Sequence, residues 1–143
     1  MSCMMGDYLA NKLNDHVTGV AVYTPPTQIK VSLCTAKGTI AQCCANTNFT
    51  ECTGGGYAQV NVGVGSTNWN ASGTTSPRLS DNKLAVSFGT PSADWGTVVA
   101  WRLLDQSGNL LWWGDESPSK SCPAYAAVSS AIGAITMALP QGT

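Results

Sequence analysis

The sequence predicts a mostly β fold, a single jelly-roll-like β-sandwich domain with one N-terminal α-helix. Two observations support this prediction. Six or seven short segments alternate apolar with polar residues, and turns rich in Gly, Pro and Asn separate them. The 143 residues are the usual size of one domain, and they contain neither an internal repeat nor a linker. We therefore expect residues 1–143 to form one domain.

The N-terminal helix is expected within residues 1–19. Met5, Leu9, Leu13 and Val17 recur four residues apart, which places them on one face of a helix. Gly19 is a suitable end for it. A helix of about 12–14 residues is marginal alone, so its apolar stripe must pack against something. We expect it to pack on the domain's own sheet, with a neighbouring subunit as the alternative.

Strand and loop patterns alternate in the first two thirds of the chain. Apolar residues alternate with polar or small residues in three expected strands, at 29–33, 58–64 and 84–88. The segments between them are rich in Thr, Ser, Asn and Gly. We expect long loops there, at residues 35–56 and 65–82.

The clearest β pattern is a hairpin near the C-terminal end. Residues 97–104 and 110–113 are apolar on both alternations, and residues 105–109 supply turn formers. A strand that is apolar on both faces is either central in a sandwich or covered on one face by the helix or a partner. A last strand is expected at 132–139, and a weaker one near 125–128.

Low charge is the most informative feature of the composition. Only 10% of the residues are Asp, Glu, Lys or Arg, against about 25% in an ordinary soluble domain. The net charge is −1 and the basic residues are scattered, so nucleic acid is not an expected partner. No apolar run reaches bilayer length and no secretory signal is visible, so we expect a protein made in the cytoplasm that does not act at a membrane. Few charges and five tryptophans favour a surface that partners bury.

The six cysteines are expected to be free thiols. In a reducing compartment thiols are the default, although a disulfide formed late stays open. The spacing of the cysteines lacks the pairs typical of structural zinc sites, so we expect no metal and no other cofactor. They are Cys3, Cys34, Cys43, Cys44, Cys52 and Cys122.

The residues that enzymes use for acid–base chemistry form no recognisable set. His16 is the single histidine, and its neighbour Asp15 points to a different side of the expected helix. The chain lacks the motifs of nucleophile elbows and phosphate-binding loops, and the spacing of its carboxylates selects no pair. We expect no catalytic residues and no enzyme.

The order of several short motifs resembles a family of small bacteriophage virion proteins, of the tail-fibre-like or minor structural type. The resemblance covers nearly the whole chain and implies a β-sandwich component of the phage particle without an active site. The matching residues are Tyr8-Leu9, Asn11, Leu13, Asp15-His16, Tyr23-Thr24-Pro25-Pro26, Val31, Leu33, Gly55-Gly56-Tyr57-Ala58, Val60, Trp95-Gly96-Thr97-Val98, Asp105, Gly108-Asn109-Leu110-Leu111 and Gly114.

These observations lead to a functional hypothesis. We expect a capsid decoration, or cement, protein in the virion that bridges subunits of the major capsid protein and forms a homodimer or homotrimer. A tail, baseplate or fibre-associated structural protein is the first alternative. A glycan-binding module that uses exposed tryptophans is the second.

The expected partner interface includes Trp69, which stands in a polar loop and is the best candidate for an exposed anchor. The full set of expected interface residues is Met4, Met5, Tyr8, Cys43, Cys44, Phe49 and Trp69.

Overall fold

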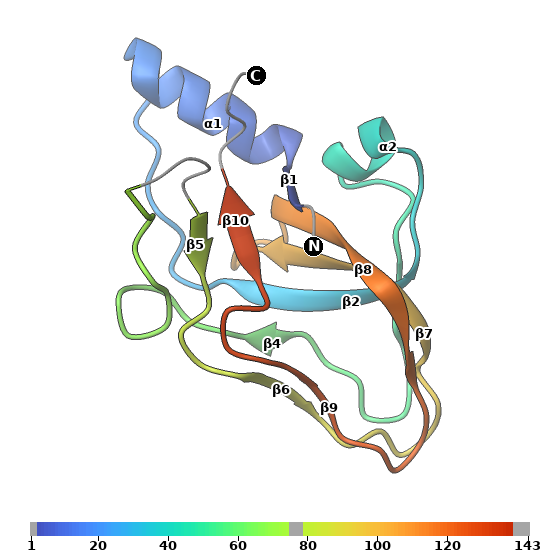
Figure 1. Cartoon of the computed structure of the whole chain (residues 1–143). Helices are drawn as coiled ribbons and strands as arrows, with labels where there is room; N and C mark the ends of the chain where they lie inside the picture. Colours follow the sequence, from blue (N-terminus) through green and yellow to red (C-terminus); the bar gives the residue numbers. More distant parts are fainter. Residues whose placement is uncertain (1–2, 75–78, 139–143) are drawn as a thin grey trace.

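The computed structural model describes residues 3–74 and 79–138, and it confirms a mainly β domain (Figure 1). Three antiparallel sheets and two helices make up the described part of the chain. The elements in chain order are β1 (Cys3–Met5), α1 (Asp7–Thr18), β2 (Lys30–Ala36), α2 (Ile40–Cys44), β3 (Thr50–Glu51), β4 (Val60–Asn61), β5 (Leu79–Asp81), β6 (Val86–Gly89), β7 (Gly96–Leu104), β8 (Leu110–Cys122), β9 (Val128–Ser130) and β10 (Thr136–Ala138).

The largest sheet has six strands in the order β1-β8-β7-β2-β3, with β4 also paired to β2. Its centre is the expected hairpin of β7 and β8. The Asp105 carboxylate accepts hydrogen bonds from the backbone N–H groups of Ser107 and Asn109, 2.8 and 2.9 Å long, which closes the turn. Gly108 supplies the positive φ of 83° that this turn needs.

One face of the large sheet carries the main core. Two-stranded ribbons, β10–β5 and β6–β9, lie at this face together with α1, in place of a second large sheet. Side chains from the sheet, such as Trp101, Leu103 and Leu111, are buried against Leu9 of α1 and Met137 of β10. Figure 1 shows α1 at one end of the molecule and the β6–β9 ribbon at the other.

The opposite face of the sheet carries a smaller core beneath α2. Leu104, Leu110 and Trp113 are buried there with Cys43 of α2. Apolar residues of β7 and β8 therefore enter two different cores, which explains why both alternations are apolar in this hairpin.

The helix α1 confirms the expected N-terminal helix but begins later than the apolar spacing indicates. Met5 belongs to β1, because residues 3–5 pair with β8. Gly6 then passes so close to the hairpin that a Cβ atom there would lie 2.7 Å from the Leu110 carbonyl oxygen. At the other end, Gly19 caps the helix in the left-handed conformation. In the described ranges, no helix has the length and apolar character needed to cross a bilayer.

The two expected long loops contain regular structure. Residues 35–56 hold α2, which begins with a capping box between Thr39 and Gln42, and also β3. Residues 65–82 hold β5, and Trp69 forms an isolated bridge with Asn82. Of the expected strand at 58–64, only Val60–Asn61 is a strand. Residues 75–78 of the second loop, and Leu139 at the expected end of the last strand, lie outside the described residues.

Candidate interaction surface

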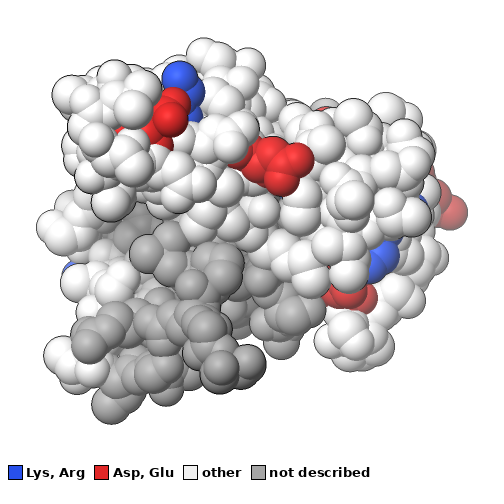
Figure 2. All heavy atoms as spheres, turned by 90° about the horizontal axis from the view of Figure 1, so that it is seen from above, with Lys and Arg blue, Asp and Glu red and all other residues white. Residues whose placement is uncertain are grey.

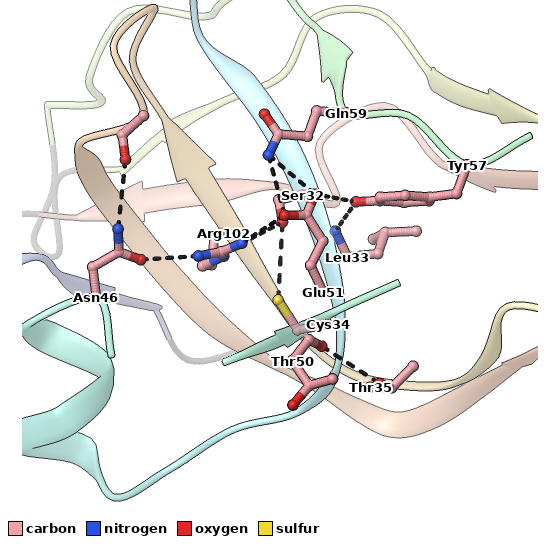
Figure 3. A network of polar contacts seen from close by, with 11 residues as sticks. Ser32, Leu33, Cys34, Thr35, Asn46, Thr50, Glu51, Tyr57, Gln59 and Arg102 are labelled. Carbon is pink, nitrogen blue, oxygen red and sulfur yellow. Dashed lines mark hydrogen bonds and ion pairs between the residues drawn. The ribbon is translucent and has the colours of Figure 1, made fainter. Parts of the chain in front are cut away.

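Residues 37–51, which include α2 above the small core, are attached to the large sheet through Arg102 of β7 (Figure 3). The Arg102 guanidinium donates hydrogen bonds to Asn46 Oδ1, at 3.0 Å, and to Ser32 Oγ, at 3.0 Å. It also forms an ion pair with Glu51, with 2.9 Å between Nη2 and Oε2. The Arg102 side chain is 12% exposed, so these contacts are partly shielded from water.

Glu51 has further partners on its other side. The Tyr57 hydroxyl donates to Glu51 Oε1 at 2.9 Å and accepts from the Leu33 backbone N–H at 2.9 Å. Gln59 Nε2 donates to both Glu51 oxygens. Burial raises the pKa of Tyr57, so its hydroxyl stays protonated and remains a donor. The hydrogen bonds of the Glu51 carboxylate therefore hold the structure together, and they leave it poorly positioned for acid–base chemistry.

Aromatic and cationic side chains continue this attachment across the small core. Arg102 lies over the Phe49 ring, 5.0 Å from its centroid, and Phe49 meets Trp113 edge to face at 5.8 Å. Lys37 lies over Trp113 at 5.4 Å and pairs with Asp115. Residues 37–51 are therefore held on the sheet by a continuous set of contacts, which we call the Arg102 network.

Five cysteines whose burial the structure describes lie in the two cores or beside them. Cys34, Cys43, Cys44, Cys52 and Cys122 are free, and of these only Cys44 is not fully buried. Burial raises the pKa of Cys52 to about 11, which keeps it a neutral thiol. Within residues 3–74 and 79–138, no three His, Cys, Asp or Glu side chains are grouped so that they could hold a metal ion.

An apolar groove of about 460 Å³ opens beside α1. Among the residues that the structure describes, its walls come from α1, β5, β8, β10 and two connecting segments, and none of these lining residues is charged. The lining residues are Leu9, Leu13, Tyr23, Pro26, Ile29, Ser72, Ser80, Leu111, Trp112 and Met137.

Three exposed valines lie in the stretch of chain between the groove residues Leu13 and Tyr23. Val17, Val20 and Val22 are 84%, 77% and 83% exposed, and we call them the valine ridge. Val17 continues the stripe of Leu9 and Leu13 by one more helical step, so the apolar face of α1 extends past the groove into solvent. Figure 2 views the molecule from the side of the two helices, where the charged side chains of the described residues form small, separate patches.

The comparison with protein families identifies the relatives of this chain. A family described as podophage GP4 fiber I protein gp80 matches residues 4–138, which is nearly the whole sequence. The chain belongs to this gp80 family. It is therefore a bacteriophage structural protein of the virion, and the expected resemblance to small phage virion proteins is confirmed. A comparison with curated proteins found no match.

In this gp80-family chain, the expected interface residues divide between the two cores. Met4, Cys44 and Phe49 are half-buried around the fully buried Cys43 in the small core. Met5 and Tyr8 pack against the main core. Cys43 lies inside its own domain and offers no surface to a partner.

The expectation that Trp69 is an exposed anchor is wrong. Its side chain is 7% exposed and belongs to the main core, and its Nε1 donates a 2.9 Å hydrogen bond to the Gly63 carbonyl. Trp95, Trp101 and Trp113 are also buried, and Trp112 is half-buried in the groove wall. A glycan-binding module in this fold would lack the exposed tryptophans on which that alternative depended.

The groove and the valine ridge were missed at the level of sequence. The apolar stripe was expected to pack on the domain's own sheet, with a neighbouring subunit as the alternative. Of its residues Met5, Leu9, Leu13 and Val17, only Leu9 is fully buried. The sequence did contain a signal for this surface, because the segment from Val17 to Ile29 has no charged residue and several apolar ones.

Proposed function

We propose that this protein is a non-enzymatic structural subunit of a phage fibre or fibre-attachment region, which binds other virion subunits through the uncharged surface beside α1. The main observation behind this proposal is the apolar groove, which is flanked by three valines that are each at least 77% exposed. Apolar surface of this kind favours association when a partner covers it. The word fiber in the description of the family supports the fibre location.

The polar side chains support a structural role in place of a chemical one. Arg102, Glu51 and Tyr57 are bonded to one another or to the backbone and are partly or largely buried. General acid–base catalysis requires groups that can reach a substrate and exchange protons with it. These groups instead fix residues 37–51 to the sheet.

A capsid decoration protein that bridges major capsid subunits is the second candidate. It is favoured by the same low charge content, 10% of residues, and by the same apolar surface. The two candidates differ in the partner and in the number of copies on each particle.

Quantitative mass spectrometry of purified virions tests the location. A fibre component should be present in few copies relative to the major capsid protein, whereas a shell protein should approach the capsid subunit in number. Cross-linking of intact virions, followed by peptide identification, should join residues near α1 to a fibre or tail protein. Cross-links mainly to the major capsid protein, together with a high copy number, would replace the fibre proposal with the decoration proposal.

A further inference from the structure

We infer that the hydrogen bond between His16 and the backbone of Tyr23 is a pH-sensitive device, which forms while the imidazole is neutral and breaks when the imidazole gains a second proton. The Tyr23 backbone N–H donates to His16 Nδ1 at 3.1 Å. This bond fixes the segment that follows α1. The inference goes beyond the proposed function and concerns the purified protein alone.

The segment after α1 folds back onto the last turn of the helix through three backbone N–H groups. Those of Val20 and Ala21 both donate to the Asp15 carbonyl oxygen, at 2.9 and 3.2 Å. The third, that of Tyr23, donates to the side chain of the next residue, His16. A backbone carbonyl oxygen stays an acceptor as the pH changes, whereas an imidazole nitrogen can take up a proton. Of these three bonds, pH therefore acts only on the third.

A proton competes directly with this hydrogen bond. A backbone N–H can only donate, so Nδ1 of His16 must keep its lone pair, and the neutral ring must carry its hydrogen on Nε2. A second proton binds at Nδ1, the atom that faces the Tyr23 N–H. Two N–H groups then point at each other, and the hydrogen bond is lost.

The chain has one side chain of the type that ordinarily titrates near neutral pH. Histidine changes charge between about pH 5 and 8, and His16 is the single histidine. Residues 17–29 contain no Asp, Glu, Lys or Arg, and the groove-lining residues that the structure describes in β5, β8 and β10 are not titratable. The charged and titratable side chains around this site are Lys12 and Asp15 on α1, Tyr23 after it, and Tyr8 and Asp105 near Tyr23.

The hydrogen bond matters at the edge of the groove, because Tyr23 lines the groove. Val20 and Val22 are 77% and 83% exposed, so burial of their side chains does little to hold the segment in place. The hydrogen bonds to Asp15 and His16 hold it instead. Loss of the His16 bond should therefore loosen the backbone at Tyr23, while Val20 stays attached to the helix.

Nuclear magnetic resonance of the isotope-labelled protein at about pH 8 and about pH 5, the two ends of the histidine range, tests this inference. At the higher pH, the Tyr23 amide nitrogen and His16 Nδ1 should show a scalar coupling across the hydrogen bond, with the ring hydrogen on Nε2. At the lower pH this coupling should vanish. Protection of the Tyr23 amide against hydrogen exchange, corrected for the intrinsic rate, should fall about fivefold, the factor expected for one net hydrogen bond. The Ala21 amide is the internal reference and should keep its protection, because a carbonyl oxygen accepts from it.

Two substitutions at the exposed His16 separate this hydrogen bond from other effects of pH. His16→Asn places an amide oxygen at the position of Nδ1, where it accepts at every pH, so the Tyr23 amide should stay protected at both pH values. His16→Phe keeps a ring but has no acceptor, so protection should be low at both.

Three results would overturn the inference. The wild type could carry the ring hydrogen on Nδ1 of His16 at the higher pH, its Tyr23 amide could be equally protected at both pH values, or the fall in protection could persist in His16→Phe. None of these measurements involves virions, so they can fail while the proposed function holds.

Discussion

At the scale of single residues, Arg102 holds together segments that are distant in the sequence. Its guanidinium bonds to Ser32, Asn46 and Glu51, and its plane covers Phe49. Replacing it by methionine keeps the apolar stem but leaves Glu51 without its cation. We expect Arg102→Met to lower the free energy of unfolding by about 2–4 kcal/mol, measured by urea denaturation.

The control for this prediction is another basic residue with a hydrogen bond. Lys83 is exposed and donates to the Ser66 carbonyl. Lys83→Met should change the free energy of unfolding by less than about 0.5 kcal/mol, because water replaces an exposed hydrogen bond at little cost. Equal effects of the two substitutions would show that the Arg102 network adds nothing to stability.

The buried thiol of Cys52 makes stability depend on alkaline pH. Burial raises its pKa from 9.0 to about 11, so the folded protein retains this proton where the unfolded chain has lost it. The resulting stability is complete below pH 9 and is lost as the pH rises from 9 to about 11.

The comparison of wild type with Cys52→Ala isolates this contribution. Urea denaturation at several pH values should show a decline above pH 9 that is up to about 2 kcal/mol smaller in the variant. The decline that remains in the variant includes Tyr57, whose pKa burial also raises. Parallel curves for the two proteins would contradict the prediction.

The burial of individual residues was the least predictable property. Trp69 stands among polar residues, and its burial depends on Gly63 nearby and on Ile135 and Met137 of the same core, far along the chain. Arg102 sits within an apolar strand, and Ser32, its partner, is 70 residues away. Neither contact follows from local spacing, because the topology of the sheet creates both.

At the scale of elements, local signals predicted α1, the β7–β8 hairpin and the strands β2 and β6, and long-range pairing decided most of the other elements. The spacing of Leu9 and Leu13 and the turn residues around Gly108 act within a few positions. The helix α2 also had a local signal, Thr39 followed by Gln42, which is the capping-box pattern. The short strands β3 and β5 pair with distant segments, and their own residues show no distinct strand pattern.

The attachment of α2 leads to a prediction at this scale. Phe49 packs between Arg102 and Trp113, whereas Ile40 of α2 is 59% exposed. Phe49→Ala should lower the free energy of unfolding by about 2 kcal/mol and speed amide hydrogen exchange in residues 40–51. The matched substitution Ile40→Ala should have little effect on either measurement. Unchanged exchange in Phe49→Ala would show that other contacts hold this segment.

At the scale of the whole molecule, the composition predicted that the protein has uncharged, apolar surface better than it predicted where that surface lies. A chain with 10% charged residues was expected to have an apolar contact surface; the groove and the valine ridge are apolar, and contact with a partner there stays a prediction. The prediction placed this surface partly at Trp69 and Cys43, which are both buried. The sequence gives no direct information on which apolar side chains remain exposed to solvent.

The order of strands in the large sheet has a consequence for synthesis on the ribosome. One edge of β2 can pair with β3 and β4 soon after they emerge, but the other edge waits for β7, about 60 residues later. At translation rates of 5–20 residues per second, that wait is roughly 3 to 12 seconds. During this wait, the nascent β2, which contains Val31 and Leu33, has an unpaired edge. A strand of a neighbouring nascent chain can pair with this edge. Slow translation of residues 62–96 would lengthen this exposure and favour aggregation over folding.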